Sequence, residues 1–414
     1  MIRLVFAYLG ERKLTVALNV LLLAISVGML VVLLQFSRQA EERFLDGAEN
    51  IDLVVGAKGS PLQLVLSSVY HLDQPTGNIP LEALGDLRAN PMVASAIPLA
   101  LGDNFRGFRI VGTEPALIDL YAAELARGRS FARGLEVVIG AEMAAATGAQ
   151  LGQRFIGSHG LAADEGEQGH EATPFVVVGI LAPTGKPIDR LILTSVESVW
   201  DVHGIEHPAG DHARGEHTQD GHAHGGGAGE LEDRGAAAEI TAILLGYRSP
   251  AAAVRLPAMI DRNTAMQSAS PARESARLIT LFEPAIEALG LFALLLGGAG
   301  AFAVFVTLWS AVRGREGDLA LLRVMGASRA MIFGTVLLEG AIVALMAALI
   351  GLGFAHGLLW LASRSFPEAG IVPFAFHPGE AAIVAGAVLL GMAAALLPAW
   401  NVTRNNLAPI LDRN

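Results

Sequence analysis

Residues 14–36 read LTVALNVLLLAISVGMLVVLLQF. Few polar residues, such as Asn19 and Ser26, interrupt this apolar run. A helix needs about 20 mostly apolar residues to cross a hydrocarbon core of roughly 30 Å. The stretch therefore predicts a membrane-spanning helix.

A cleaved signal peptide is the alternative for this first stretch, because Arg3, Arg12 and Lys13 precede it. The apolar run is longer than a typical signal-peptide core, and residues 36–40 form a poor cleavage site. We therefore expect a retained anchor.

Three further stretches of similar length and apolarity lie in the last third of the chain, at residues 286–312, 331–361 and 380–400. Residues 39–283 contain nothing comparable. Of the 414 residues, 52% are hydrophobic and only 17% are charged, which is typical of membrane proteins. We predict an α-helical membrane protein with four transmembrane helices and a large mixed α/β extracytoplasmic domain inserted between helices 1 and 2.

Composition also excludes several classes of site and partner. The chain has no cysteine, so it has neither disulfides nor thiolate metal sites, and it suits an oxidising compartment such as the periplasm. Its formal net charge of −11 and the lack of a basic stripe argue against a nucleic-acid partner.

The short connecting segments indicate the orientation, because cytoplasmic loops carry an excess of Lys and Arg. Cationic residues flank the first span, fill the segment between spans two and three, and follow span four: Arg3, Arg12, Lys13, Arg313, Arg315, Arg323, Arg329, Arg404 and Arg413. The segment between spans three and four has only Arg364. We expect a bacterial inner-membrane protein with both termini in the cytoplasm and the inserted domain in the periplasm.

The expected domains are the cytoplasmic N-terminus and first span (1–38), the periplasmic domain (39–283), and a C-terminal membrane domain with three spans and a cytoplasmic C-terminus (284–414). Short β-branched or aromatic runs predict strands in the periplasmic domain at 51–55, 108–111, 137–139, 175–180 and 240–245. Helices are expected at 115–126, at 140–147 and at 262–281, the last continuing toward the membrane.

A histidine-rich insert occupies about residues 201–234 and contains His203, His207, His212, His217, His222 and His224. Imidazole with interleaved carboxylates suits Zn²⁺ or another transition metal such as Ni²⁺ or Cu²⁺. Gly204 and Pro208 disfavour a rigid tetrahedral site. Two interpretations stay open, namely weak multivalent metal capture and an inert solvated linker.

The segment between spans two and three reads RGREGDLALLRVMGASR, residues 313–329. Leu319, Leu322 and Met325 can share one face of a short helix, and Gly326 permits a turn before span three. Such a helix on the cytoplasmic side can dock into a partner's groove. The alternative is a helix that lies passively on the membrane surface.

This segment, continued as REGDLALLRVMGASRAMI, resembles the conserved block of MacB/FtsX-type permeases, which include macrolide-export, lipoprotein-releasing and cell-division permeases. The family pattern is matched at Arg313, Glu316, Leu319, Leu322, Arg323, Gly326, Ala327 and Ser328 and departed from at Asp318 and Met325. The ending LLPAWNVTRNNLAPILDRN and the outer-domain stretches LARGRSF, EVVIGAEMAAATGAQLGQRF and FVVVGIL are also similar to the family.

The resemblance implies a type VII ABC machine. Two permease copies, or this chain and a paralogue, would assemble with a cytoplasmic ATPase homodimer that binds the ATP. The matched residues and Arg315 would engage the ATPase, and its motion would be relayed to the periplasmic domain by mechanotransmission. A periplasmic protein or lipoprotein is a further implied partner.

The chain lacks a phosphate-binding loop of its own. In the nearest candidate, residues 179–187, five residues separate the glycines and Pro187 replaces the magnesium-binding hydroxyl. We therefore expect a permease subunit that is not an enzyme, binds no cofactor of its own beyond a metal ion at the histidine-rich insert, and exports or extracts a periplasmic substrate. The alternative is a non-transporting FtsX-like signal relay that regulates a periplasmic hydrolase. A membrane metalloenzyme is the weakest interpretation, because no zinc-protease motif occurs.

Two ionisable residues lie inside the predicted third span. Glu339 is either a coupling or packing residue that faces the bundle, or a protonated or hydrated group near the interface. For His356 we expect a hydrogen bond directed into the bundle. In the same span, Gly353 and Gly357 are spaced to let another helix approach closely.

Overall fold

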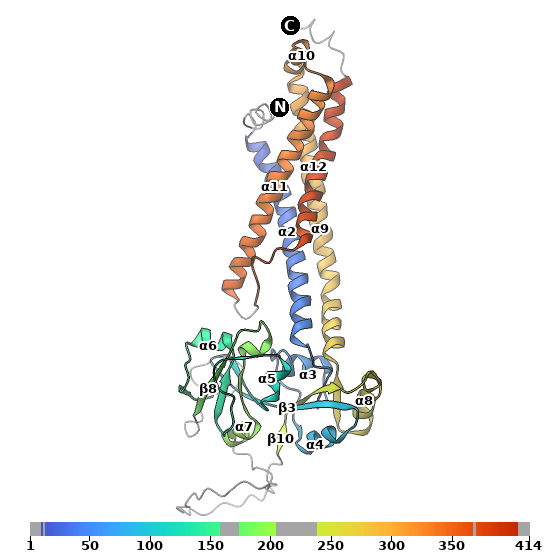
Figure 1. Cartoon of the computed structure of the whole chain (residues 1–414). Coiled ribbons are helices and arrows are strands. Elements are labelled where there is room, and N and C mark those ends of the chain that lie inside the picture. Colours follow the sequence, from blue (N-terminus) through green and yellow to red (C-terminus); the bar gives the residue numbers. More distant parts are fainter. Residues whose placement is uncertain (1–9, 11–12, 158–173, 204–237, 367–369, 405–414) are drawn as a thin grey trace, which may run out of the picture. The chain divides into compact units, whose positions relative to one another are not determined.

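The computed structural model describes residues 10, 13–157, 174–203, 238–366 and 370–404. The chain divides into two compact units, residues 1–42 together with 279–414, and residues 43–278. The first unit is a bundle of long helices, and the second is built on a β-sheet (Figure 1). The sheet unit is thus inserted between the first and second spans of the helical unit.

In the part of the chain that the structure describes, four helices are long and apolar enough to cross a membrane. They are α2 (Lys13–Gly47), α9 (Pro271–Gly314), α11 (Arg329–Ser365) and α12 (Pro378–Arg404). Each contains one of the four predicted spans, so the prediction is confirmed. The short helix α10 (Glu316–Val324) separates α9 from α11.

The bundle is held together by small and branched side chains. Leu23 of α2, Leu308 of α9 and Ala347 of α11 belong to one buried cluster that Ala395 of α12 completes. Lipid tails are as apolar as these side chains, so the hydrophobic effect does not drive helices together inside a membrane. Close van der Waals packing of this kind drives their association instead.

Glycines set the closest helix crossings. A methyl group at Gly351 would lie 2.5 Å from the carbonyl oxygen of Ala24, so α2 and α11 touch backbone to backbone. A methyl group at Gly391 would lie 2.4 Å from Cβ of Ala344. The expected pair Gly353 and Gly357 has no such neighbour within 4 Å among the described residues of this chain, because the crossing with α2 lies at Gly351.

The described residues of the sheet unit form one large mixed sheet and one two-stranded sheet. The large sheet has the strand order β12-β1-β11-β3-β4-β9-β6-β8-β5, with β7 paired to β8. Its strands are β1 (Leu53–Ala57), β3 (Val93–Phe105), β4 (Phe108–Thr113), β5 (Leu125–Gly128), β6 (Glu136–Ile139), β7 (Arg154–Phe155), β8 (Phe175–Leu181), β9 (Ile192–Ser195), β11 (Ala242–Tyr247) and β12 (Met266–Ala269). The small sheet pairs β2 (Ile79–Pro80) with β10 (Glu239–Ile240).

Alternate residues of the central strands face two separate cores, as the two-residue period of a strand requires. Val54 and Leu244 join a cluster with α3 (Pro61–Ser68) and α5 (Ala116–Leu120). Val55 and Ile243 join a second cluster on the other face. That second cluster also contains residues of α4 (Glu82–Ala89), α7 (Val196–His203) and α8 (Pro250–Asn263). The remaining helices of this unit are α6 (Ala141–Thr147) and the 3-10 helix η1 (Pro187–Arg190).

Each of the five predicted strands overlaps an observed strand, and the helix expected at 140–147 is α6. The helix expected at 115–126 is wrong in its second half. Ala122 has a φ of 51°, which ends the helical stretch after α5, and the chain then forms β5.

The helix expected at 262–281 is wrong in its first part. Residues 266–269 form β12, which pairs with β1. The long helix α9 begins only at Pro271, where a proline is favourable because the first helical position needs no N–H donor.

Candidate coupling site at one end of the bundle

A turn precedes helix α10 and another turn follows it. Arg315 breaks α9 from α10, and after Val324 the chain turns through Gly326, whose φ is 102°. A glycine adopts this left-handed conformation without the penalty that a Cβ imposes. The Ser328 hydroxyl then accepts a hydrogen bond of 3.1 Å from the Met331 N–H and caps α11.

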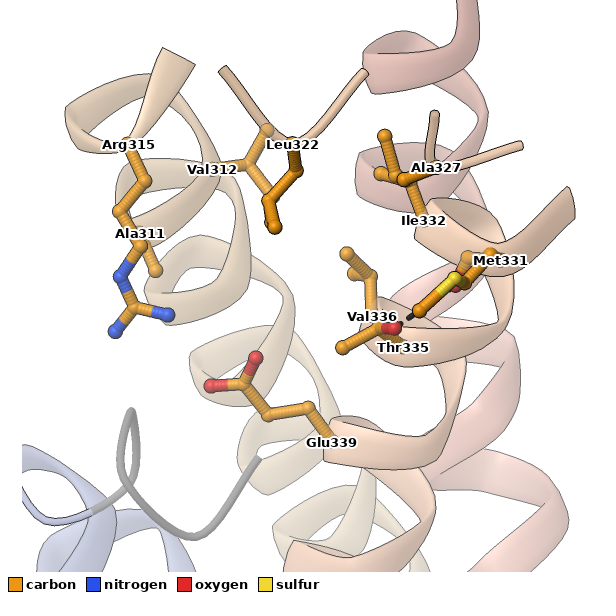
Figure 2. Close-up of a pocket in the computed structure, with 10 residues that line it drawn as sticks. All are labelled: Ala311, Val312, Arg315, Leu322, Ala327, Met331, Ile332, Thr335, Val336 and Glu339. Carbon is orange, nitrogen blue, oxygen red and sulfur yellow. Dashed lines mark hydrogen bonds between the residues drawn. The ribbon is translucent and has the colours of Figure 1, made fainter. Parts of the chain in front are cut away.

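A small cavity lies where α9, α10 and α11 meet (Figure 2). Its walls are mostly apolar and consist of Ala311, Val312, Arg315, Leu322, Ala327, Met331, Ile332, Thr335, Val336 and Glu339. Its free volume of about 50 Å³ is far below the roughly 300 Å³ at which ligand pockets begin. We read it as the packing site that receives Leu322 and holds α10 against the bundle.

Two charged groups reach this cavity. Glu339 is only 8% exposed although it lies in a membrane-spanning helix. Figure 2 shows the Arg315 guanidinium group and the Glu339 carboxylate directed toward the same side of the cavity. The Glu339 side chain is buried in the bundle, about 15 Å along α11 from the start of the helix, and its coupling or packing role stays a prediction.

An apolar face of α10 is exposed. Leu321, Val324 and Met325 are 60%, 65% and 68% exposed, and their spacing of three and four residues places them on one side of a helix. Of the predicted face of Leu319, Leu322 and Met325, the structure describes the side chains of Leu322 and Met325 only, and these two have different surroundings. Leu322 turns into the cavity, Met325 is exposed, and the side chain of Leu319 lies outside the described part.

The other predicted coupling residues surround this helix. Arg313 stacks over the Trp309 ring at 5.4 Å, Arg323 is half-buried, and Ala327 lines the cavity. Of the Glu316 side chain the structure describes nothing. The structure brings Arg315, Leu322 and Ala327 together around one cavity.

Two sequence profiles match the chain. The family described as FtsX-like permease C-terminal matches residues 290–407, which contain the coupling site. The family described as MacB-like periplasmic core domain matches residues 16–220. The chain belongs to the MacB/FtsX-type permease family.

Two solved structures are similar to part of this permease. The periplasmic region of MacB from Actinobacillus actinomycetemcomitans shares 12% identity over 57% of this chain and 97% of its own, with a TM-score of 0.35. The extracellular domain of the noncanonic ABC-type transporter YknZ from Gram-positive bacteria shares 13% identity over 53% of this chain and 98% of its own, with a TM-score of 0.30. A search of curated proteins gave no match.

The MacB/FtsX-type permease is thus a multi-pass membrane protein with an extracytoplasmic domain, in which the inserted sheet unit corresponds to the periplasmic core domain. His356, the second ionisable residue of the third span, lies toward the other end of α11 from Arg329. Its Nδ1 lies 2.7 Å from the Pro373 carbonyl oxygen, and its Nε2 lies 3.2 Å from Oε2 of Glu380 in α12.

Of the predicted metal ligands of the permease, only His203 falls within the described residues, and His207, His212, His217, His222 and His224 lie outside them. His203 ends α7, where Nδ1 contacts the Val199 carbonyl oxygen at 2.7 Å and Nε2 lies 3.3 Å from Asp103 Oδ1. The parts of the chain that the structure describes contain no group of three or more potential metal ligands. No sequence pattern indicates this His203–Asp103 pair, because the two residues are 100 positions apart.

Proposed function

We propose that this chain is the permease subunit of an ABC transporter of the MacB/FtsX type. A separate cytoplasmic ATPase homodimer binds and hydrolyses ATP, and this chain pairs with a second copy or a paralogue. The chain converts motion of the ATPase into export or extraction of a substrate on the periplasmic side. Residues 1–38 and 284–414 act as the membrane domain, and residues 39–283 act as the periplasmic domain.

The observation that carries the proposal is the exposed apolar face of α10. Leu321, Val324 and Met325 form the exposed apolar face of an amphipathic helix. Such a face can insert into a hydrophobic groove of a partner. The seat of Leu322 in the cavity and the turn at Gly326 hold this helix in a defined position. A load applied to α10 therefore reaches the spans on either side of it.

The charges around α10 support its placement in the cytoplasm. Arg313, Arg315, Arg323 and Arg329 lie within 17 residues of sequence between two spans. The positive-inside rule assigns such a segment, and with it both termini, to the cytoplasmic side.

Helix α9 supports mechanotransmission. It is a continuous helix of 44 residues from Pro271, directly after strand β12, to Gly314, directly before α10. A helix of this length rises about 66 Å and can carry a displacement along its axis, with Pro284 as the one interior position that lacks a backbone N–H donor. The proposed route connects the ATPase-docking helix with the sheet unit through a single element.

The proposal is tested by purifying the ATPase with the permease variant Leu321→Arg/Val324→Arg. Two charges on the docking face are expected to reduce the co-purified ATPase at least tenfold, because they would be buried unpaired in an apolar groove. Ala330→Arg is the matched control, since Ala330 is exposed at the start of α11 but lies outside the apolar face. Equal recovery of the ATPase with both variants would refute docking through α10.

Assays on the same purified complex distinguish a transporter from a signal relay. A transporter is expected to move a substrate in an ATP-dependent manner in reconstituted vesicles. Activation of a periplasmic hydrolase without substrate movement would assign the chain to the relay class instead.

We also propose that the histidine-rich insert captures Zn²⁺ or another transition metal weakly and links the machine to metal homeostasis. The support is the density of histidines and carboxylates in residues 203–224. Deleting residues 204–224, which spares the anchored His203, should abolish Zn²⁺ binding by the purified protein in calorimetry and any Zn²⁺ response of the ATPase. Unchanged binding and response after the deletion would show that the insert is an inert linker.

A further inference from the structure

Residues 370–377, which lead into α12 in the helical unit, contain neither helix nor strand. With the next two residues they read GIVPFAFHPG and include no Asp, Glu, Lys or Arg. Val372, Phe374 and Phe376 are 57%, 59% and 72% exposed, whereas the residues at 371, 373, 375 and 377 are half-buried. Large apolar side chains gathered on one side of a segment mark an interaction surface.

Two glutamine side chains of α2 take up backbone hydrogen bonds of this segment. Gln39 accepts from the Val372 N–H at 2.9 Å and donates to the Val372 carbonyl at 3.1 Å. Gln35, one turn earlier, donates to the carbonyl oxygen of Ala375. Water can serve such groups on a solvent-exposed loop, but next to lipid they need partners within the protein. The pattern is typical of a segment that water does not reach.

The imidazole ring of His356 supports the same segment from α11. Its Nδ1 lies 2.7 Å from the Pro373 carbonyl oxygen. Its ring centroid lies 4.7 Å from that of Phe376 and 6.2 Å from that of Phe374. Because the imidazole is buried, the two phenyl rings rest against it and present the remainder of their surface outward.

The lengths of the neighbouring helices place the segment at one boundary of the hydrocarbon core. Residues 14–34 of α2 and 381–400 of α12 are apolar runs that each rise about 30 Å as a helix, which matches the thickness of the core. Gln35 follows the first run, Glu380 precedes the second, and their side chains are hydrogen-bonded. Residues 371–377 lead directly into Glu380 and therefore lie at this boundary, at the other end of α11 from α10.

The last turns of α11, beyond His356, carry side chains typical of the same level of a membrane. The Arg364 guanidinium lies 4.4 Å from the centre of the Trp360 ring, and both residue types anchor helices at the headgroups. Leu361 is exposed between them. A protein partner usually meets an apolar patch that has a polar rim, which residues 370–379 do not supply. Lipid acyl chains are the occupant that fits this surface.

We propose that residues 371–377 form a lipid-facing segment at the boundary of the hydrocarbon core, with Val372, Phe374 and Phe376 inserted among the acyl chains. Gln35, Gln39 and His356 shield the backbone of the segment and hold it at this depth. In the orientation proposed above, the segment lies in the outer leaflet. The inference does not depend on the substrate or on docking of the ATPase.

Fluorescence quenching tests the proposal with the full-length protein in lipid nanodiscs. The chain has no native cysteine, so a polarity-sensitive fluorophore can be attached to Phe374→Cys and to Phe376→Cys. Lipids with a nitroxide near the headgroup should quench both labels by roughly half, and aqueous iodide should quench them little. If either variant fails to fold, Val372→Cys gives the same readout.

Two further positions calibrate the measurement. Leu349→Cys, at an exposed position of α11 inside the third span, is the lipid-facing control, and Asp86→Cys in the sheet unit is the water-facing control. Labels at 374 and 376 that iodide quenches as strongly as the label at 86 would overturn the proposal. Protection from both quenchers would overturn it too, because protein would then cover the segment.

Gln39→Leu tests the shielding of the backbone. The substitution leaves the N–H and the carbonyl of Val372 unpaired next to lipid, so the segment should move toward water. The label at 376 should lose roughly half of its quenching by lipid and gain quenching by iodide. Glu42→Leu, at an exposed position further along α2, is the matched control and should change neither value. Unchanged lipid quenching in Gln39→Leu would refute the shielding role.

Discussion

Asp103 and His203 meet in the extracytoplasmic domain although 100 positions of sequence separate them. Asp103 is 3% exposed, whereas the His203 side chain is partly exposed. The hydrogen bond to Asp103 raises the pKa of His203 above its usual value, against the opposing effect of burial. The pair anchors the end of α7, from which the histidine-rich insert departs.

This pair predicts a pH dependence of local stability. A base whose folded pKa is raised contributes stability that is fully present below its unfolded pKa of about 6.5 and is lost as the pH rises through the folded pKa. Protection of the α7 amides against hydrogen exchange should therefore be several-fold higher at pH 5.5 than at pH 9.

The matched variant is His203→Gln, which keeps a polar side chain of similar reach and removes the titration. Its α7 amides should show little difference between the two pH values. A variant that retains the full wild-type difference would show that another group governs this helix.

At the scale of secondary-structure elements, the C-terminal end of α10 is closed by the turn that follows it. The Ala327 N–H donates to the Leu322 carbonyl at 2.9 Å, and this bond forms only if Gly326 adopts its positive φ. Replacing Gly326 with alanine should cost about 1–2 kcal/mol, the usual penalty of a left-handed conformation. Exchange of the Ala327 amide should accelerate roughly tenfold.

Gly317→Ala is the control for this prediction. Gly317 lies inside α10, a methyl group there would meet no described residue within 4 Å, and its φ is not positive. This substitution should leave the turn intact and strengthen the helix slightly. Equal acceleration in both variants would mean that helix α10 as a whole, and not its terminal turn, controls the exchange.

The elements differ in how far sequence predicts them. The four spans are predictable because a run of some 20 apolar residues is a local property with few other interpretations. The long strand β3 was not predicted, since Pro98, Gly102 and Asp103 resemble loop residues and only pairing with β11 and β4 makes this segment a strand.

At the candidate site, the side of α10 that faces the bundle could likewise not be predicted from the sequence. Sequence alone indicates that the helix is amphipathic, and Leu322 and Leu321 are equally apolar. Which of them faces the bundle depends on how α9 and α11 pack to form the cavity, and the apolar pattern of α10 carries no information about that packing. The turn at Gly326 was predictable because the conformational freedom of glycine is local.

At the scale of the whole molecule, the proposed function requires that α10 lies in the cytoplasm and that the sheet unit lies outside. The chain has no cysteine, so single-cysteine reporters can be introduced without removing any native residue. Gly317 and Asp86 are both exposed, the first in α10 and the second in α4 of the sheet unit.

The most direct test is labelling of Gly317→Cys and Asp86→Cys with a membrane-impermeant maleimide in cells whose outer membrane has been permeabilised. We predict that Asp86→Cys reacts at once and that Gly317→Cys reacts only after the inner membrane is broken. Labelling of Gly317→Cys while the inner membrane is intact would contradict the account, because no cytoplasmic ATPase could then reach α10.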